Sequence, residues 1–281
     1  MKIAIVGQQE RCIAWEKHLR KLKVIEEVII TNSLAASDKV NAVLLIDDSP
    51  SRLEQLLNSV RLGYHTYLIS RLSDDTESLE KIYHSAEESG VKVQFSHWPS
   101  MAESTNLIKK LIEKPELIQI KKENNVLPSA NPVSTDSTYE WIDEVALIIK
   151  WMGGNIHHME VKPVSLGTFL LGLAITFRFE NSSVATLHYL SGTDRENHQR
   201  IISSSTLLVD CDITKQITRI LSVTDFGKIS VRIDEFDPTD SAKWSVVQFI
   251  KSIQTGQKTV FSAYDALLTS RAVNRIYSEL P

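Results

Sequence analysis

The first 115 residues alternate short apolar runs with segments of helix length, and this alternation constrains the fold more than any other feature of the sequence. Buried strands separated by amphipathic helices are typical of βαβ units around a parallel sheet. Two of the helical segments end at Gly63 and Gly90, and glycine commonly terminates helices. The pattern therefore predicts a Rossmann-like N-terminal domain, with strands at Lys2–Val6, Val24–Asn32, Val40–Asp48, "HTYLIS" and "VKVQF".

The pattern changes after about Glu123. A polar stretch with two prolines, "NNVLPSANPVSTDST", precedes a predicted helix over Tyr139–Met152. Strand patterns follow: "TFLLGLAITFRF" and "SVATLHYL" read as a hairpin, and "STLLVDCD", "KQITRILSV" and "KISVRID" as further strands. Two helices complete the chain, the second beginning at a capping box of Ser262 and Asp265. We expect one domain over residues 1–118 and another over 119–281.

Charge and composition exclude several classes of protein. The net charge is −4, and lysine and arginine are scattered, so nothing indicates a nucleic-acid partner. No apolar run approaches the roughly 18 residues of a membrane span, and no signal-peptide pattern is present, so we expect a cytoplasmic protein without a membrane partner. Cys12 and Cys211 lack the spacing of metal ligands or of a disulfide framework.

Three stretches of the second half carry a resemblance to a known family: "EWIDEVALIIKWMGG", "ITFRFENSSVATL" and "KWSVVQFIKSIQTGQKTVFSAYDALLTSRAVNRIY". Together with the nucleotide-type first half, they resemble the glucose–fructose oxidoreductase/inositol dehydrogenase (Gfo/Idh/MocA) family. The resemblance implies an α/β chain, with a Rossmann-like parallel sheet followed by an α+β domain whose large, mostly antiparallel sheet is open. It also implies NAD or NADP as cofactor, a sugar, polyol or related small molecule as substrate, and a homodimer or higher homo-oligomer formed through the C-terminal sheet.

The phosphate-binding turn of such a domain departs from its usual pattern. In G-x-G-x-x-G the glycines permit a tight turn, close approach to the pyrophosphate and close helix packing. Here the three positions are Gly7, Gln9 and Cys12. The side chain of Gln9 would lie where the phosphates belong and would resist a positive φ. Arg11 is a candidate phosphate contact, although the turn also reads as a plain strand-to-helix connection.

Other cofactor positions are also altered. The acidic residue that would hold the ribose falls at Asn32, which reads equally as a turn residue. The resemblance places a catalytic lysine at Ser70, so the lysine is absent, and Arg71 cannot exchange a proton near neutrality. Ser49 lies where the family contacts the ribose, but two aspartates precede it and would repel a diphosphate. We interpret Ser49 as the cap of the next helix.

The resemblance also implies an aspartate and a histidine four residues apart on the helix that follows the linker, and these align to Glu140 and Glu144. This spacing places both carboxylates on one helical face, where they are candidate catalytic acids and bases. Alternatively, Glu140 forms a capping box with Ser137. The candidate for contact with a substrate ring is Trp98. His158 and Glu160 share a strand face, but two ligands do not make a metal site, and none is expected.

The lysine, the histidine, two glycines and the ribose acid are absent together, and these groups act as a unit in hydride transfer. We therefore predict a weakly active or non-catalytic homologue that binds a small ligand or serves in assembly, with NAD or NADP as cofactor if any binds. The alternative is an active NAD(P)-dependent oxidoreductase of a sugar-like molecule. A third hypothesis is a non-redox enzyme that uses Glu140 and Glu144.

Overall fold

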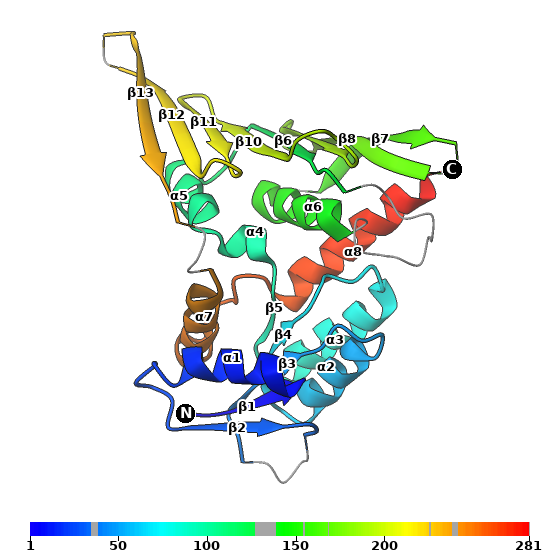
Figure 1. The fold of residues 1–281 in the computed structure, drawn as a ribbon, viewed down its shortest axis with the longest axis vertical. Helices are drawn as coiled ribbons and strands as arrows, with labels where there is room; N and C mark the ends of the chain where they lie inside the picture. Colours follow the sequence, from blue (N-terminus) through cyan, green and yellow to red (C-terminus); the bar gives the residue numbers. More distant parts are fainter. Residues whose placement is uncertain are drawn as a thin grey trace. The chain divides into compact units, whose positions relative to one another are not determined.

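The computed structural model describes residues 1–34, 39–126, 139–153, 155–167, 169–224, 226–237 and 241–280, which form two compact units (Figure 1). Unit 1 comprises Met1–Met101 and Ser241–Arg271, and unit 2 comprises Ala102–Asp240 and Ala272–Pro281. The units therefore differ from the single division predicted at residue 118. The reason is that an apolar helix near the C-terminus packs into the core of unit 1.

Unit 1 contains a five-stranded sheet in the order β2-β1-β3-β4-β5, and all four pairings are parallel. The Rossmann-like sheet predicted from the alternating pattern is thus present. Its central strand β3 is buried along its whole length, as is typical of parallel strands covered on both faces. The strands are β1 (Lys2–Gly7), β2 (Glu27–Thr31), β3 (Ala42–Ile46), β4 (His65–Ile69) and β5 (Val93–Phe95).

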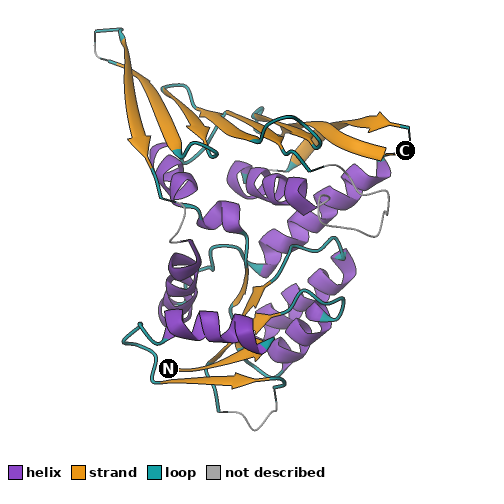
Figure 2. Cartoon of the chain, viewed as in Figure 1, coloured by secondary structure: helices purple, strands orange, loops and turns teal. Residues whose placement is uncertain are grey.

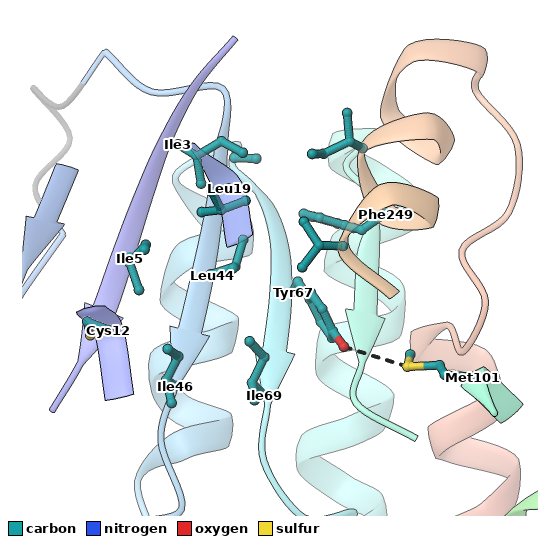
Figure 3. Close-up of a cluster of buried hydrophobic side chains, with 13 residues drawn as sticks. Ile3, Ile5, Cys12, Leu19, Leu44, Ile46, Tyr67, Ile69, Met101 and Phe249 are labelled. Atoms are coloured by element: carbon teal, nitrogen blue, oxygen red, sulfur yellow. Dashed lines mark hydrogen bonds between the residues drawn. The ribbon is translucent and has the colours of Figure 1, made fainter. Parts of the chain in front are cut away.

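Unit 1 contains the helices α1 (Gln9–Leu19), α2 (Arg52–Arg61), α3 (Thr76–Ser89), α4 (Trp98–Met101) and α7 (Ser241–Thr255), and the first part of the last helix, up to Arg271. Figure 3 shows the core, in which Leu19 of α1 and Phe249 of α7 pack against the strands. Tyr67 lies inside this core, where its hydroxyl donates to Ser245 at 3.0 Å. On α1 the residues that point into the core are Cys12 and Leu19, whereas Ile13 is 40% exposed.

Unit 2 contains an eight-stranded sheet in the order β13-β12-β11-β10-β6-β9-β8-β7. Only the β6–β9 pairing is parallel, so the sheet is mostly antiparallel, as the resemblance implied. The predicted hairpin is β8 and β9. The strands are β6 (Leu117–Glu123), β7 (Ile156–Leu166), β8 (Phe169–Phe179), β9 (Val184–Leu190), β10 (Asn197–Ser203), β11 (Leu207–Asp212), β12 (Ile217–Val223) and β13 (Ile229–Glu235).

Helices α5 (Glu103–Leu111) and α6 (Tyr139–Met152) lie on the same side of this sheet (Figure 2). We call the side that they cover the inner face and the other side the outer face. The last helix, α8 (Ala263–Ser278), begins at the predicted capping box, in which the backbone N–H of Ser262 donates to Asp265 at 2.7 Å. Ser137, the predicted partner of Glu140, lies outside the described residues. No helix within the described residues is long and apolar enough to cross a membrane.

Candidate functional site

The first candidate site is the carboxyl edge of the sheet in unit 1, at the junction of β1 and β3. In a 2-1-3-4-5 sheet the connections diverge at this point, and ligands of open α/β folds bind there. Gly7 ends β1 with φ +150°, and a Cβ on it would lie 2.4 Å from the carbonyl oxygen of Ile46 in β3. Close approach of β1 and β3 is therefore sufficient to explain the glycine at this position, and no ligand is needed for that explanation.

Helix α1 begins two residues after this glycine, at Gln9. Gln9 is exposed as its first residue and does not have a positive φ, so the strain expected at this position does not arise. Gln8 precedes the helix and makes no capping hydrogen bond with its side chain. Cys12 is buried beneath the first turn, and burial raises the pKa of its thiol. Gln9 and Cys12 thus occupy the second and third glycine positions as parts of an ordinary helix.

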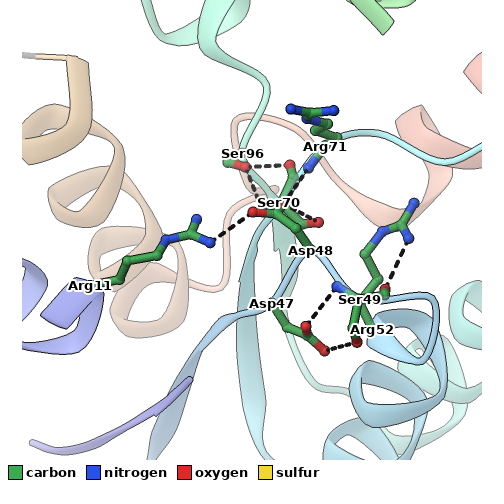
Figure 4. A network of polar contacts seen from close by, with 8 residues as sticks. All are labelled: Arg11, Asp47, Asp48, Ser49, Arg52, Ser70, Arg71 and Ser96. Carbon is green, nitrogen blue, oxygen red and sulfur yellow. Dashed lines mark hydrogen bonds and ion pairs between the residues drawn. The ribbon is translucent and has the colours of Figure 1, made fainter. Parts of the chain in front are cut away.

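An ion pair connects the two sides of the β1/β3 junction, as Figure 4 shows. Nη1 of Arg11 lies 2.7 Å from Oδ2 of Asp48, just beyond the end of β3. The hydroxyl of Ser70, which follows β4, donates to Oδ1 of Asp48 at 3.0 Å. Although burial raises the pKa of Asp48, hydrogen bonds from Arg11 and Ser70 hold it below its usual value. The junction therefore carries a fixed carboxylate, and Arg11 is already paired with it.

Ser49 belongs to a separate local network. Its N–H and its hydroxyl both donate to the carboxylate of Asp47, each at 2.8 Å. Ser51, not Ser49, is the residue that precedes α2, and its side chain makes no capping bond. The interpretation of Ser49 as the cap of this helix is therefore wrong, because α2 begins at Arg52 and Ser51 occupies the cap position.

Two other predicted residues lie apart from the ion pair. Asn32 follows the end of β2 and is exposed. Trp98 opens α4 with 38% of its surface exposed, and its ring stacks on Trp15 of α1, with ring centroids 6.4 Å apart and planes at 16°. One face of Trp98 therefore contacts protein already. The roles of Asn32 and Trp98 toward a ligand stay predictions.

A diphosphate does not fit the β1/β3 junction as it stands. The carboxylate of Asp48 would repel it, and Arg11 would have to leave that carboxylate in order to contact a phosphate. Ser70, at the position of the family's lysine, is likewise bound to Asp48. The start of α1 offers backbone N–H groups, but the acidic Glu10 lies in the same turn.

The second candidate site lies on the inner face of unit 2, where α6 crosses β6 and β10. Glu144 is 1% exposed and forms a two-point ion pair with Arg200 of β10, at 2.7 and 3.0 Å. Its Oε1 also lies 3.0 Å from Nε2 of His198. Burial alone would raise the pKa of Glu144, but Arg200 and His198 hold it well below the usual range. A carboxylate held in this way is a weak proton acceptor.

Glu140 lies one turn earlier on α6 and is more exposed. It accepts a hydrogen bond from Asn124, which follows β6, at 3.0 Å, and lies 3.5 Å from Nζ of Lys122 on β6. The predicted common face of Glu140 and Glu144 is therefore present. Burial and the charge of Glu144 raise the pKa of the neighbouring Asp143 to about 7.

The sequence did not indicate His198 or Arg200, the partners of Glu144. Both point inward from β10. This strand was not predicted, because its inward row, His198, Arg200 and the buried Ile202, is mixed rather than apolar. Arg200 is 3% exposed, and a buried arginine is nearly always paired. No group of three or more candidate metal ligands occurs among the described residues.

Known structures share this architecture over nearly the whole chain, although no protein-family model and no curated protein sequence matches it. UDP-N-acetylglucosamine 3-dehydrogenase GnnA from Acidithiobacillus ferrooxidans superposes with a TM-score of 0.83 at 12% identity, covering 100% of this chain and 97% of that one. A dehydrogenase from Chromobacterium violaceum superposes with a TM-score of 0.82 at 15% identity, and the match covers 99% of this chain and 94% of that one. For the dehydrogenase MviM from Clostridium difficile the TM-score is 0.77 at 12% identity, and the match covers 100% of this chain and 99% of that one. The chain therefore has the fold of the Gfo/Idh/MocA-type dehydrogenases, as the resemblance implied.

Proposed function

We propose that this protein keeps the fold of these dehydrogenases but not their ordinary hydride-transfer chemistry, and that it serves in binding a small ligand or in assembly. The observation that carries the proposal is the ion pair of Arg11 with Asp48 at the β1/β3 junction. This pair engages Arg11, the candidate phosphate contact of the turn, and places a carboxylate where a coenzyme of this fold would need room for phosphate. Ser70, bound to Asp48, stands where a proton-transferring lysine is expected.

Coenzyme titration tests this proposal. NADH and NADPH should show no saturable change in tryptophan fluorescence at concentrations below about 100 μM. Trp15 and Trp98 are suitable reporters, because Trp15 lies on α1, whose first turn contains Arg11, and Trp98 stacks on Trp15. Asp48→Asn should strengthen coenzyme binding, because it removes the negative charge and frees Arg11. Saturable binding of either coenzyme to the wild-type protein below that concentration would overturn the proposal.

The second candidate function is an active NAD(P)-dependent oxidoreductase of a sugar, polyol or related small molecule. One observation favours it: α1 begins without a side-chain cap, so no side chain competes for the N–H groups that would face an anion. The names of GnnA and MviM as dehydrogenases point in the same direction. An activity assay distinguishes the two candidate functions. It follows absorbance at the reduced-nicotinamide band, with UDP-N-acetylglucosamine or myo-inositol as probe and NAD⁺ or NADP⁺ as oxidant. Only the oxidoreductase predicts turnover.

The assembly role has a surface that fits it, on the outer face at β11, β12 and β13. Three alternate residues of the edge strand β13 point outward, and Ile229, Val231 and Ile233 are 72%, 57% and 60% exposed. Leu208 and Val223 extend this row. Monomers rarely expose an apolar row of this kind on an edge strand. We call these five residues the outer-face patch.

We propose that a second copy of this chain covers the outer-face patch. A two-fold contact joins the same surface of both partners, so a rim with charges of one sign would repel its own copy. The outer face carries both signs, because Asp210 lies opposite Arg219 on the neighbouring strand. Light scattering after gel filtration should give the mass of a dimer or a higher oligomer. Val231→Lys should shift the protein to monomer, and Leu62→Lys, at an exposed leucine of unit 1, should not. A monomeric wild-type protein would contradict the proposal.

A further inference from the structure

A polar pocket of about 230 Å³ opens on the outer face of unit 2, over the neighbouring strands β10, β11 and β12. It lies at the ends of β11 and β12 that the turn over residues 213–216 connects, and the outer-face patch extends towards their other ends. Its lining comprises two amides, two carboxylates, two cations and the aliphatic side chain of Ile217. Sites for drug-sized ligands are larger, roughly 300–1,000 Å³, so this pocket suits a small polar molecule.

One carboxylate and one cation of this pocket already neutralise each other. Nζ of Lys215 lies 2.8 Å from Oδ2 of Asp212, and the backbone N–H of Lys215 donates to Oδ1 of the same carboxylate at 2.9 Å. Burial raises the pKa of Asp212, but these hydrogen bonds hold it below its usual value. This pair therefore forms a wall of the pocket and offers a ligand no unpaired charge.

The other two charges of the pocket face each other without forming an ion pair. Asp210 of β11 and Arg219 of β12 are direct cross-strand neighbours on the outer face. Oδ1 of Asp210 accepts a hydrogen bond from the amide of Gln199 at 2.7 Å, and its Oδ2 has no partner among the described residues. The guanidinium of Arg219 makes no hydrogen bond or ion pair with any described residue. A half-used carboxylate and an unused guanidinium therefore line the same pocket.

We propose that this pocket binds an α-amino acid as its zwitterion, with the ligand carboxylate at Arg219 and the ligand ammonium group at Asp210. A guanidinium binds a carboxylate through two parallel hydrogen bonds, and hydrogen bonds between ionised groups are about twice as strong as neutral ones. The amides of Asn197 and Gln199 already donate to carboxylates, so their oxygens are acceptors for the remaining ammonium protons. The side chain of the amino acid would lie against Ile217.

Charge favours a zwitterion in this pocket over a simple anion or a simple cation. The two carboxylates balance Lys215 and Arg219, so the lining has no net charge. A plain carboxylate at Arg219 would be repelled by Asp210, and a plain amine at Asp210 would be repelled by Arg219. An α-amino acid carries both charges on one carbon atom and satisfies both residues. This site goes beyond the proposed function, because it depends neither on a coenzyme nor on a second copy of the chain.

Isothermal titration calorimetry of the full chain tests the site with three probes of similar shape. L-Valine carries both charges, isovalerate lacks the ammonium group, and isobutylamine lacks the carboxylate. L-Valine should bind saturably with a Kd of about 1 mM or below, and the other two should bind about tenfold more weakly or not at all. Absence of saturable L-valine binding up to about 10 mM, or equal binding of L-valine and isovalerate, would overturn the inference.

Three variants locate the binding. Arg219→Gln and Asp210→Asn should each weaken L-valine binding by about tenfold or more, because each removes one of the two charges. Arg178→Gln is the matched control, since Arg178 of β8 is also exposed and also has no partner among the described residues, and it should leave the affinity unchanged. Unchanged affinity in Asp210→Asn, or an equal loss in Arg178→Gln, would contradict the assignment. Coenzyme titration reports on Arg11 and Asp48, so failure there is distinguishable from failure here.

Discussion

Arg200→Met should lower the free energy of unfolding by about 3–5 kcal/mol, because it leaves the carboxylate of Glu144 buried without its cation. Glu144 is 1% exposed, and water cannot replace the two hydrogen bonds that the guanidinium supplies. The loss should be smaller at pH 5.5 than at pH 8, since protonation of His198, 3.0 Å away, restores a positive charge beside Glu144. Urea unfolding followed by circular dichroism at both pH values measures the effect.

Two further variants show whether the loss comes from an unpaired buried charge. Lys215→Met breaks a surface ion pair with Asp212 in the same unit and should cost less than about 1 kcal/mol. The double variant Arg200→Met/Glu144→Leu removes both buried charges and should recover most of the stability lost in the single variant. If the double variant is as unstable as Arg200→Met, the cost arises from lost packing rather than from the charge on Glu144.

The regular elements with clear local signals were predicted well. The helical segment expected to end at Gly90 is α3 (Thr76–Ser89), and the helix expected over Tyr139–Met152 is confirmed to the residue. The first ends at Gly90, which has φ +68° and so terminates the helix by itself. Both helices are specified by residues within a turn or two of their ends, and a single sequence contains that information.

Strands with polar inward faces were missed for a physical reason. On β6 and β10 the inward positions include Lys122, His198 and Arg200, so the alternation of apolar and polar residues that marks a half-buried strand is broken. These polar positions are the ones that make the buried ion-pair cluster. The features that obscured the strands are therefore the features that define the site.

The contacts of the candidate sites could not be predicted, because they join residues far apart in the sequence. Arg11 and Asp48 meet because β1 and β3 are neighbours in the sheet, and local pattern does not reveal strand order. Glu144 and Arg200 meet because α6 lies over β10. The catalytic roles of Glu140 and Glu144 stay predictions, and the ion pair with Arg200 favours a structural role for Glu144.

Gly7→Ala should reduce the free energy of unfolding by about 3 kcal/mol or more, through strain and steric overlap together. Its φ of +150° disfavours any side chain, and the new Cβ would lie 2.4 Å from the backbone oxygen of Ile46, which cannot move away without displacing β3. Urea unfolding of the variant beside the wild-type protein measures this loss.

Gly90→Ala is the matched control for this substitution, because Gly90 also has a positive φ, +68°, but no atom within 4 Å of the new Cβ. It should cost only the conformational penalty of about 1–2 kcal/mol. The difference between the two variants isolates the steric contact of β1 with β3. If Gly7→Ala is no less stable than Gly90→Ala, strand packing does not explain the glycine, and a ligand-binding reason for it becomes the stronger one. A large difference instead means that the single glycine at the end of β1 is required by the close packing of two strands, and that it does not by itself indicate a dinucleotide site.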